Sequence, residues 1–129
     1  MAMQDSQSVA TDETSALISS DKVEGTAVYN RQGEKLGSIN AVMIDKVSGK
    51  VAYALMSFGG FLGIGDRYHP LPWHVLTYDT GQGGYVIDLD AGMLEGAPTY
   101  EATDTPNWSD RRWGQQLHDY YGTRPYWDH

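Results

Sequence analysis

Hydrophobic and polar residues alternate in short runs between residues 16 and 90, and glycine-containing turns separate these runs. Two of the runs, residues 35–45 and 50–58, flank the short connection "KVSGK", where Ser48 and Gly49 provide a turn. Apolar runs joined by a short connection with glycine predict a β-hairpin. Short strands with glycine turns and no helices between them favour an all-β fold, a small antiparallel barrel.

The remaining strands are expected on both sides of this hairpin. They are "ALIS" as an edge strand, "EGTAVYN", "DRYHPL" as a short edge strand and "GGYVIDLD", at residues 16–19, 24–30, 66–71 and 83–90. Gly33 lies in the turn "NRQGEK", where a left-handed backbone is least costly for glycine. Pro70 and Pro72 exclude a central strand in their segment, because proline cannot donate a ladder hydrogen bond.

The C-terminal part has a different pattern. Residues 91–108 predict a connection over the surface, and residues 109–122, "SDRRWGQQLHDYYG", predict an amphipathic helix. Ser109 is the expected N-cap and Gly122 the residue just past the end. Four side chains form one stripe at helical spacing: Trp113, Leu117, Tyr120 and Tyr121.

The predicted strand at residues 50–58 is apolar on both faces. Val51, Tyr53 and Leu55 lie on one face, and Ala52, Ala54, Met56 and Phe58 lie on the other. A strand of this kind needs cover on both sides. One face fills the barrel, and the other is covered either by the chain's own aromatic helix or by a second copy of the chain.

Length and composition limit the possible classes of protein. The 129 residues suit one domain with a tail: a disordered acidic tail at 1–15, a barrel domain at 16–92, and a connection, helix and aromatic tail at 93–129. The net charge of -8 disfavours nucleic-acid binding, because a phosphate backbone would be repelled. The chain has no cysteine, which excludes a thiolate metal site and a cysteine nucleophile. It shows no membrane-spanning run and no secretory signal, so a cytoplasmic location without membrane insertion is expected.

Three strings in this chain are more specific than composition. They are "GEKLGSI", the hairpin "D-x-x-SGKV-x-Y" that starts at Asp45, and "GGFLGIGDRYHPLPW". With these strings the chain resembles the PRC-barrel family, which is named after the cytoplasmic domain of the photosynthetic reaction centre H subunit, and looks most like its small stand-alone bacterial members. The resemblance implies a compact six-stranded β-barrel that serves as an interaction or scaffold module, and it does not imply catalysis.

Apolar and aromatic residues outside the strands are the candidate contact residues. Phe61, Leu62 and Ile64 lie in a glycine-rich loop that either plugs one end of the barrel or protrudes as a docking knob. The predicted interaction surface comprises Phe58, Phe61, Leu62, Ile64, Trp113, Leu117, Tyr121 and Trp127. We therefore expect a non-enzymatic protein–protein interaction module that self-associates, has an unidentified protein partner and needs no cofactor.

Two alternatives remain beside this hypothesis. A small-molecule or metal-binding site at the barrel rim would use Asp66, His69 and His74, although their spacing matches no established metal motif. The simpler interpretation places both histidines at the rim, hydrogen-bonded or solvated, and His118 facing water. The other alternative, an accessory subunit of a larger membrane or ribosomal assembly, rests on family analogy alone.

Overall fold

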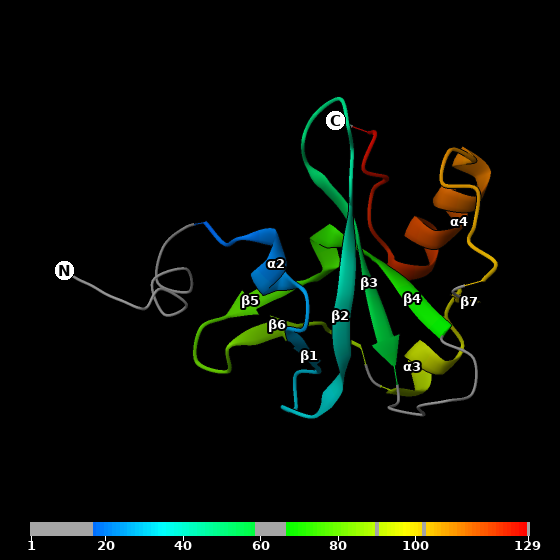
Figure 1. Ribbon diagram of the computed structural model, residues 1–129. Coiled ribbons are helices and arrows are strands. Elements are labelled where there is room, and N and C mark those ends of the chain that lie inside the picture. The colour runs from blue at the N-terminus through cyan, green and yellow to red at the C-terminus, as the bar shows by residue number, and fades with distance from the viewer. Residues whose placement is uncertain (1–16, 59–66, 90, 102, 129) are drawn as a thin grey trace.

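The structure is a computed structural model that describes residues 17–58, 67–89, 91–101 and 103–128 (Figure 1). Within these residues, seven strands form one sheet in the order β5-β6-β1-β2-β3-β4-β7. The strands are β1 Ala27–Tyr29, β2 Lys35–Ile44, β3 Val51–Phe58, β4 Arg67–Pro72, β5 Thr77–Asp79, β6 Gly84–Val86 and β7 Tyr100–Glu101. The helices are α2 Ser20–Val23, the 3-10 turn η1 Trp73–Val75, α3 Ala91–Glu95 and α4 Arg111–Tyr121.

The long hairpin of β2 and β3 is the centre of the sheet and confirms the predicted hairpin (Figure 1). Its antiparallel register runs from the pair Gly37 and Phe58 to the pair Ile44 and Val51. Gly37 permits this close pairing, because a Cβ atom at this position would overlap the carbonyl oxygen of Ser57. The glycine of "GEKLGSI" is therefore a packing requirement of the hairpin.

The prediction of a closed, six-stranded antiparallel barrel is wrong in three respects. The described sheet has seven strands, and no pairing joins its outer strands β5 and β7 within the described residues. The pairing of β1 with β6 is parallel, with Val28 opposite Tyr85. The additional strand, β7, comes from the segment that sequence analysis assigned to a surface connection, and two residues are too few for periodicity to reveal.

The N-terminal and late segments also differ from the predictions. The expected edge strand at 16–19 is absent from its described residues, and the chain instead turns into α2, because the carbonyl oxygen of Ser19 accepts the amides of Lys22 and Val23. The segment 91–108 is not a bare connection. It contains α3 as well as β7, and Leu94 of α3 is fully buried.

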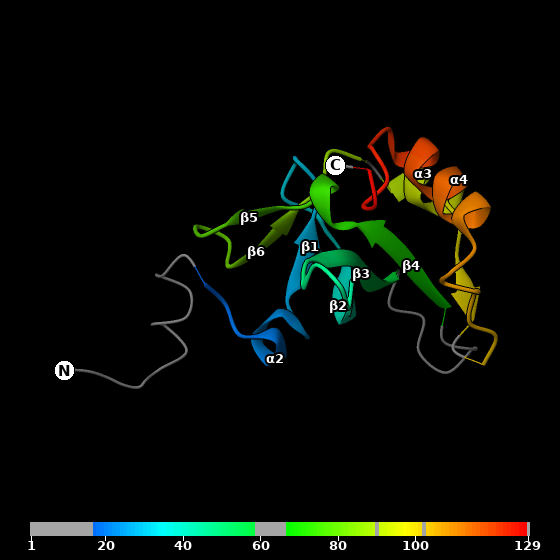
Figure 2. The same ribbon diagram turned by 90° about the horizontal axis from the view of Figure 1, so that it is seen from above.

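The curved sheet encloses the first hydrophobic core (Figure 2). Its members come from α2, from five strands and from the segments that follow β6: Val23, Val28, Leu36, Ile39, Ala54, Met56, Leu71, Tyr85, Ile87 and Leu94. Burying a side chain of this kind stabilises a fold by about 1.5–3 kcal/mol. This core accounts for one of the two apolar faces of β3.

A second core lies on the opposite face of β3, under α4. It consists of Tyr53, Leu55 and Leu117 together with Ala52, which was predicted to lie on the other face. A register shift between Met43 and Ile44, whose partners are Tyr53 and Val51, interrupts the alternation at Ala52. Leu117 is 1% exposed, and Trp113 and Tyr121 of the same helix pack beside it. In this structure the chain's own helix covers the second apolar face, which is the first of the two alternatives that the sequence left open.

Both ends of α4 are capped. The carboxylate of Asp110 accepts the amide of Arg112 at 3.0 Å, so Asp110 is the N-cap and not Ser109 as predicted. Gly122 ends the helix as predicted, in a left-handed conformation with φ of 68°, and its amide donates to the carbonyl oxygen of Asp119. The acidic N-cap and the glycine stop therefore fix where the helix begins and ends.

Candidate functional site

Tyr53 of β3 is the hub of an aromatic cluster that joins the sheet to the C-terminal segment. Its ring centroid lies 5.4–6.2 Å from those of four rings: Trp108, Trp113, His118 and Tyr126. Burial raises the pKa of Tyr53, with a further contribution from Tyr126. All four ring pairs are tilted or edge-on, which is the arrangement that aromatic quadrupoles favour.

His118 lies inside this cluster and not in water, which corrects the prediction for this residue. It is 1% exposed, and its Nδ1 lies 2.7 Å from the carbonyl oxygen of Gly114. Because a carbonyl can only accept, the Nδ1 atom carries a proton and donates it. Burial lowers the pKa of His118, although the bond to Gly114 and the charge of Asp119 oppose this shift. The imidazole is therefore a structural link between α4 and β3.

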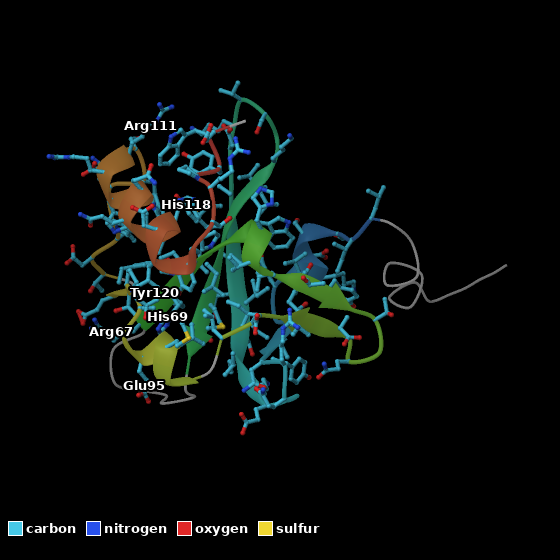
Figure 3. All side chains as sticks on the ribbon, turned by 180° about the vertical axis from the view of Figure 1, so that it is seen from behind. Arg67, His69, Glu95, Arg111, His118 and Tyr120 are labelled. Atoms are coloured by element: carbon cyan, nitrogen blue, oxygen red, sulfur yellow. The ribbon has the colours of Figure 1, made fainter. Side chains whose placement is uncertain are left out.

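His69 has the same role on β4, where α3 meets the sheet (Figure 3). It is buried, and its Nε2 donates to the carbonyl oxygen of Leu94 at 2.8 Å. Burial lowers the pKa of His69. The interpretation of His69 as a hydrogen-bonded histidine agrees with this geometry, but the residue is buried and not solvated.

The structure does not assemble the alternative metal site from the residues it describes. His74 lies on η1, exposed, at a separate hollow of about 250 Å³, and Asp66 lies outside the described residues. Among the described residues no three histidine or carboxylate side chains form a group that could hold a metal ion.

Trp127 closes the aromatic cluster from the C-terminal tail. Its ring packs against α4 at Gly114, where a Cβ atom would come within 2.9 Å of the indole. The guanidinium carbon of Arg111 lies 5.1 Å from the centre of the same ring, a cation–π contact. The C-terminal tail therefore packs against α4 through Trp127.

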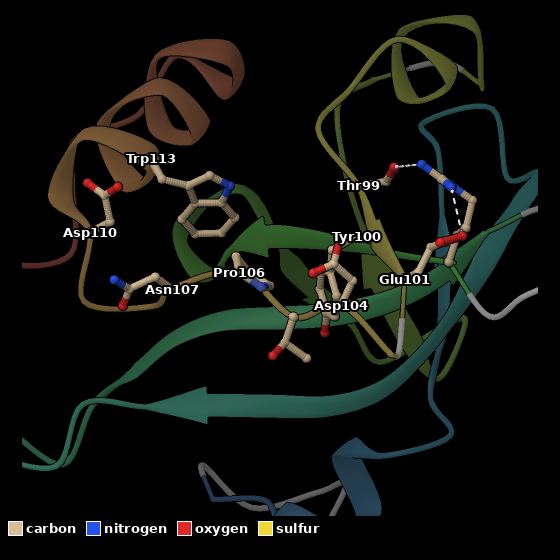
Figure 4. A pocket seen from close by; sticks show the side chains of 10 residues that line it. Thr99, Tyr100, Glu101, Asp104, Pro106, Asn107, Asp110 and Trp113 are labelled. Atoms are coloured by element: carbon tan, nitrogen blue, oxygen red, sulfur yellow. Dashed lines mark hydrogen bonds and ion pairs between the residues drawn. The ribbon is translucent and has the colours of Figure 1, made fainter.

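An acidic cavity of about 380 Å³ opens between β7 and the start of α4 (Figure 4). Its lining residues are Arg67, Thr99, Tyr100, Glu101, Asp104, Thr105, Pro106, Asn107, Asp110 and Trp113. The guanidinium of Arg67 is oriented by Thr99 at 2.9 Å and by Glu101 at 3.5 Å. The cavity combines one partly buried indole with three carboxylates and one guanidinium.

The predicted contact residues fall into two groups. Phe61, Leu62 and Ile64 lie outside the described residues, and Phe58 is the last residue of β3. The helical residues and Trp127 come together on or beside the second core: Trp113, Leu117, Tyr121 and Trp127. Of these, only Trp113 also lines the acidic cavity.

Sequence reasoning missed the polar residues of the cavity. Arg67 and Glu101 meet because β4 pairs with β7, which places Arg67 opposite Glu101 across the ladder. They are 34 positions apart, and no spacing rule connects them. The run of acids and small polar residues between 101 and 110 was the one available signal, and it is equally typical of a solvated loop.

The curved sheet, with one core inside it and a second core under a C-terminal helix, defines an open β-barrel-type domain. The family model for the PRC-barrel domain matches residues 17–94. This match covers more than half of the chain, and the chain belongs to the PRC-barrel family, as the three sequence strings indicated.

Comparison with solved structures adds a 16S ribosomal RNA processing protein, RimM, from Pseudomonas aeruginosa. It is 20% identical, with a TM-score of 0.39, and the match covers 61% of this chain and 48% of that one. The chain therefore spans about half the length of this relative. No curated protein matches the chain. Across the described residues, none of the helices has the length and apolar character needed to cross a membrane.

Proposed function

We propose that this PRC-barrel protein is a non-enzymatic interaction module that binds a partner protein at the acidic cavity. The observation that carries the proposal is Trp113, whose partly buried side chain lines the cavity within a rim of charged and amide side chains. An aromatic anchor surrounded by polar groups is the usual composition of a protein-binding hot spot. The cytoplasm is the compartment we propose for this contact.

The buried histidines support a non-enzymatic role. A general base needs an imidazole that can reach substrate. His69 and His118 are buried instead, and each directs a ring nitrogen to a backbone carbonyl. Both side chains contribute to the packing of α3 and α4 on the sheet, so neither imidazole is placed to transfer a proton to a substrate.

The rigidity of the anchor supports the same proposal. Trp113 packs edge-on against Trp108 at 5.3 Å and lies 6.2 Å from Tyr53. A side chain that is already held by its neighbours loses little conformational entropy when a partner binds. The cavity therefore presents a preorganised surface.

Self-association stays a separate prediction. A second copy of the chain was one way to cover the second apolar face of β3, and α4 of the same chain covers that face. Leu117 is not available to a partner while α4 stays on the sheet, because it is 1% exposed. We propose a partner of different sequence as the main ligand, with a second copy of the chain as the competing outcome of the test.

Site-specific photo-crosslinking in the native cell tests this function. The full chain would carry a photoreactive phenylalanine derivative at Thr105 in the cavity, or at Thr80 in the turn after β5 as a matched control. We expect one protein adduct in high yield from position 105 and not from position 80. An adduct of twice the chain's mass would indicate self-association, and equal labelling from both positions would contradict the proposal.

A further inference from the structure

The charge of the acidic cavity is unbalanced. Three carboxylates face one guanidinium, and that guanidinium is already paired with Glu101. The carboxylate of Asp110 caps α4 and lies 3.8 Å from the Nε of Arg112. Among the described residues, no ion pair involves Asp104. The cavity therefore keeps a negative charge that the fold does not neutralise.

Electron-rich rings lie beside this charge. Trp113 and Tyr100 both line the cavity, and both pack edge-on against Trp108, at 5.3 and 5.6 Å. The face of an indole attracts a cation that approaches within roughly 6 Å of its centre. Figure 4 shows the ring of Trp113 directed toward Tyr100 and Pro106, with Asp110 and Asn107 on its other side.

The volume of the cavity suits a side chain better than a large metabolite. At about 380 Å³ it lies near the lower end of known ligand pockets. An anion would be repelled by the carboxylates, and a cation would be drawn toward them by the net charge of -8 on the chain. Aromatic faces with adjacent carboxylates are the groups that recognise an ammonium or a guanidinium.

We propose that the acidic cavity accepts the positively charged side chain of a lysine or arginine from the partner protein. The cation lies against the face of Trp113, and Asp104 supplies the neutralising carboxylate. This inference rests on the proposed function and names the chemistry that the partner must present. Recognition then requires both the positive charge of the partner's side chain and its contact with the face of the Trp113 indole.

The test uses blocked tripeptides with the full chain. Gly-Arg-Gly and Gly-Lys-Gly carry the cation, and a tripeptide with citrulline keeps the shape of arginine without its charge. Binding is followed by NMR shifts of the Trp113 indole N–H and of the backbone amides of residues 103–105 and 107–110. We expect the cationic peptides to shift these signals, the citrulline peptide to bind at least about fivefold more weakly, and added salt to weaken binding.

Two variants separate the cavity from the overall charge. Asp104→Asn is expected to weaken binding of the cationic peptides about fivefold or more, because it removes a carboxylate that lines the cavity together with Trp113. Glu24→Gln removes the same charge beyond the end of α2, outside the cavity, and is expected to change nothing. Both positions are exposed, so both variants should fold as the parent does.

The results either support or overturn the inference. Equal binding of arginine and citrulline peptides, shifts that avoid Trp113, or an unchanged affinity of Asp104→Asn would each overturn it. The peptide titration needs no partner protein, so its failure is distinguishable from failure of the proposed function. If a partner is crosslinked but peptide binding does not depend on charge, the proposed interaction module stands and the recognition of a basic side chain is wrong.

Discussion

Truncation of Leu117 tests whether α4 covers the sheet of its own chain. Leu117→Ala removes a side chain that is 1% exposed and that packs in one core with Tyr53 and Leu55. Buried leucines replaced by alanine lower the free energy of unfolding by about 2–5 kcal/mol, and the loss grows with the cavity left behind. The rings around Leu117 are held by one another and cannot collapse fully, so we expect a loss of about 3–4 kcal/mol.

Urea unfolding followed by tryptophan fluorescence measures this loss. A reduction of about 3–4 kcal/mol would be a large part of the stability of a domain of this size and would lower the Tm by roughly 10–15 °C. Gln116→Ala is the matched control, because Gln116 is the exposed neighbour on the same helix. Its effect should stay within about 0.5 kcal/mol.

Two results would refute this reasoning about Leu117. A loss below about 1 kcal/mol would mean that the helix does not depend on the second core. An unfolding midpoint that rises with protein concentration would show that a second copy completes this core, since mass action then contributes to the stability. With α4 packed on its own chain, the midpoint is independent of concentration.

Three further predictions concern α4 and the two buried histidines. Gly114→Ala gains up to about 1 kcal/mol of helix propensity but displaces Trp127, so the free energy of unfolding should change by less than about 1 kcal/mol. The fluorescence emission of Trp127, obtained by comparison with a Trp127→Phe variant, should shift to the red. An unchanged emission spectrum would contradict this contact. Tyr121→Phe removes a buried hydroxyl that has no hydrogen-bond partner among the described residues, so unfolding by urea should show a stability equal to that of the parent or about 1 kcal/mol higher. Burial lowers the pKa of His118 and His69 from 6.5, so the unfolded chain binds more protons below about pH 6.5 and stability falls as the pH drops through that window. His118→Gln should flatten this fall, and a parent stability that is constant between about pH 7 and 5 would refute the assignment.

The features that sequence analysis predicted correctly are those with local signals. The β2–β3 hairpin follows from two apolar runs around Ser48 and Gly49, and the end of α4 follows from Gly122. The need for cover on both faces of β3 was also visible, because the apolar residues do not alternate with polar ones. Each of these patterns is contained within a short stretch of sequence.

The features that were missed depend on pairing between distant segments. β7 has only two residues, and it forms by pairing with β4. The parallel pairing of β1 with β6 joins strands more than 50 residues apart. The burial of His118 was missed because the position follows Leu117 and lies beside the predicted stripe. The tail residues Tyr126 and Trp127 cover it from outside the helix, which no helical periodicity can show.

Stability and recognition are coupled in this fold through α4. The residues after its N-terminus hold the second core, while Asp110 and Trp113 at its start form one wall of the acidic cavity. Any change that loosens the helix therefore also removes the cavity, and a loss of binding in such a variant would not identify a contact. Asp104 lies on the loop before α4 and makes no ion pair among the described residues, so its replacement changes the cavity's charge without moving the helix. Binding that depends on Asp104 at unchanged stability is consequently the observation that would separate recognition from folding.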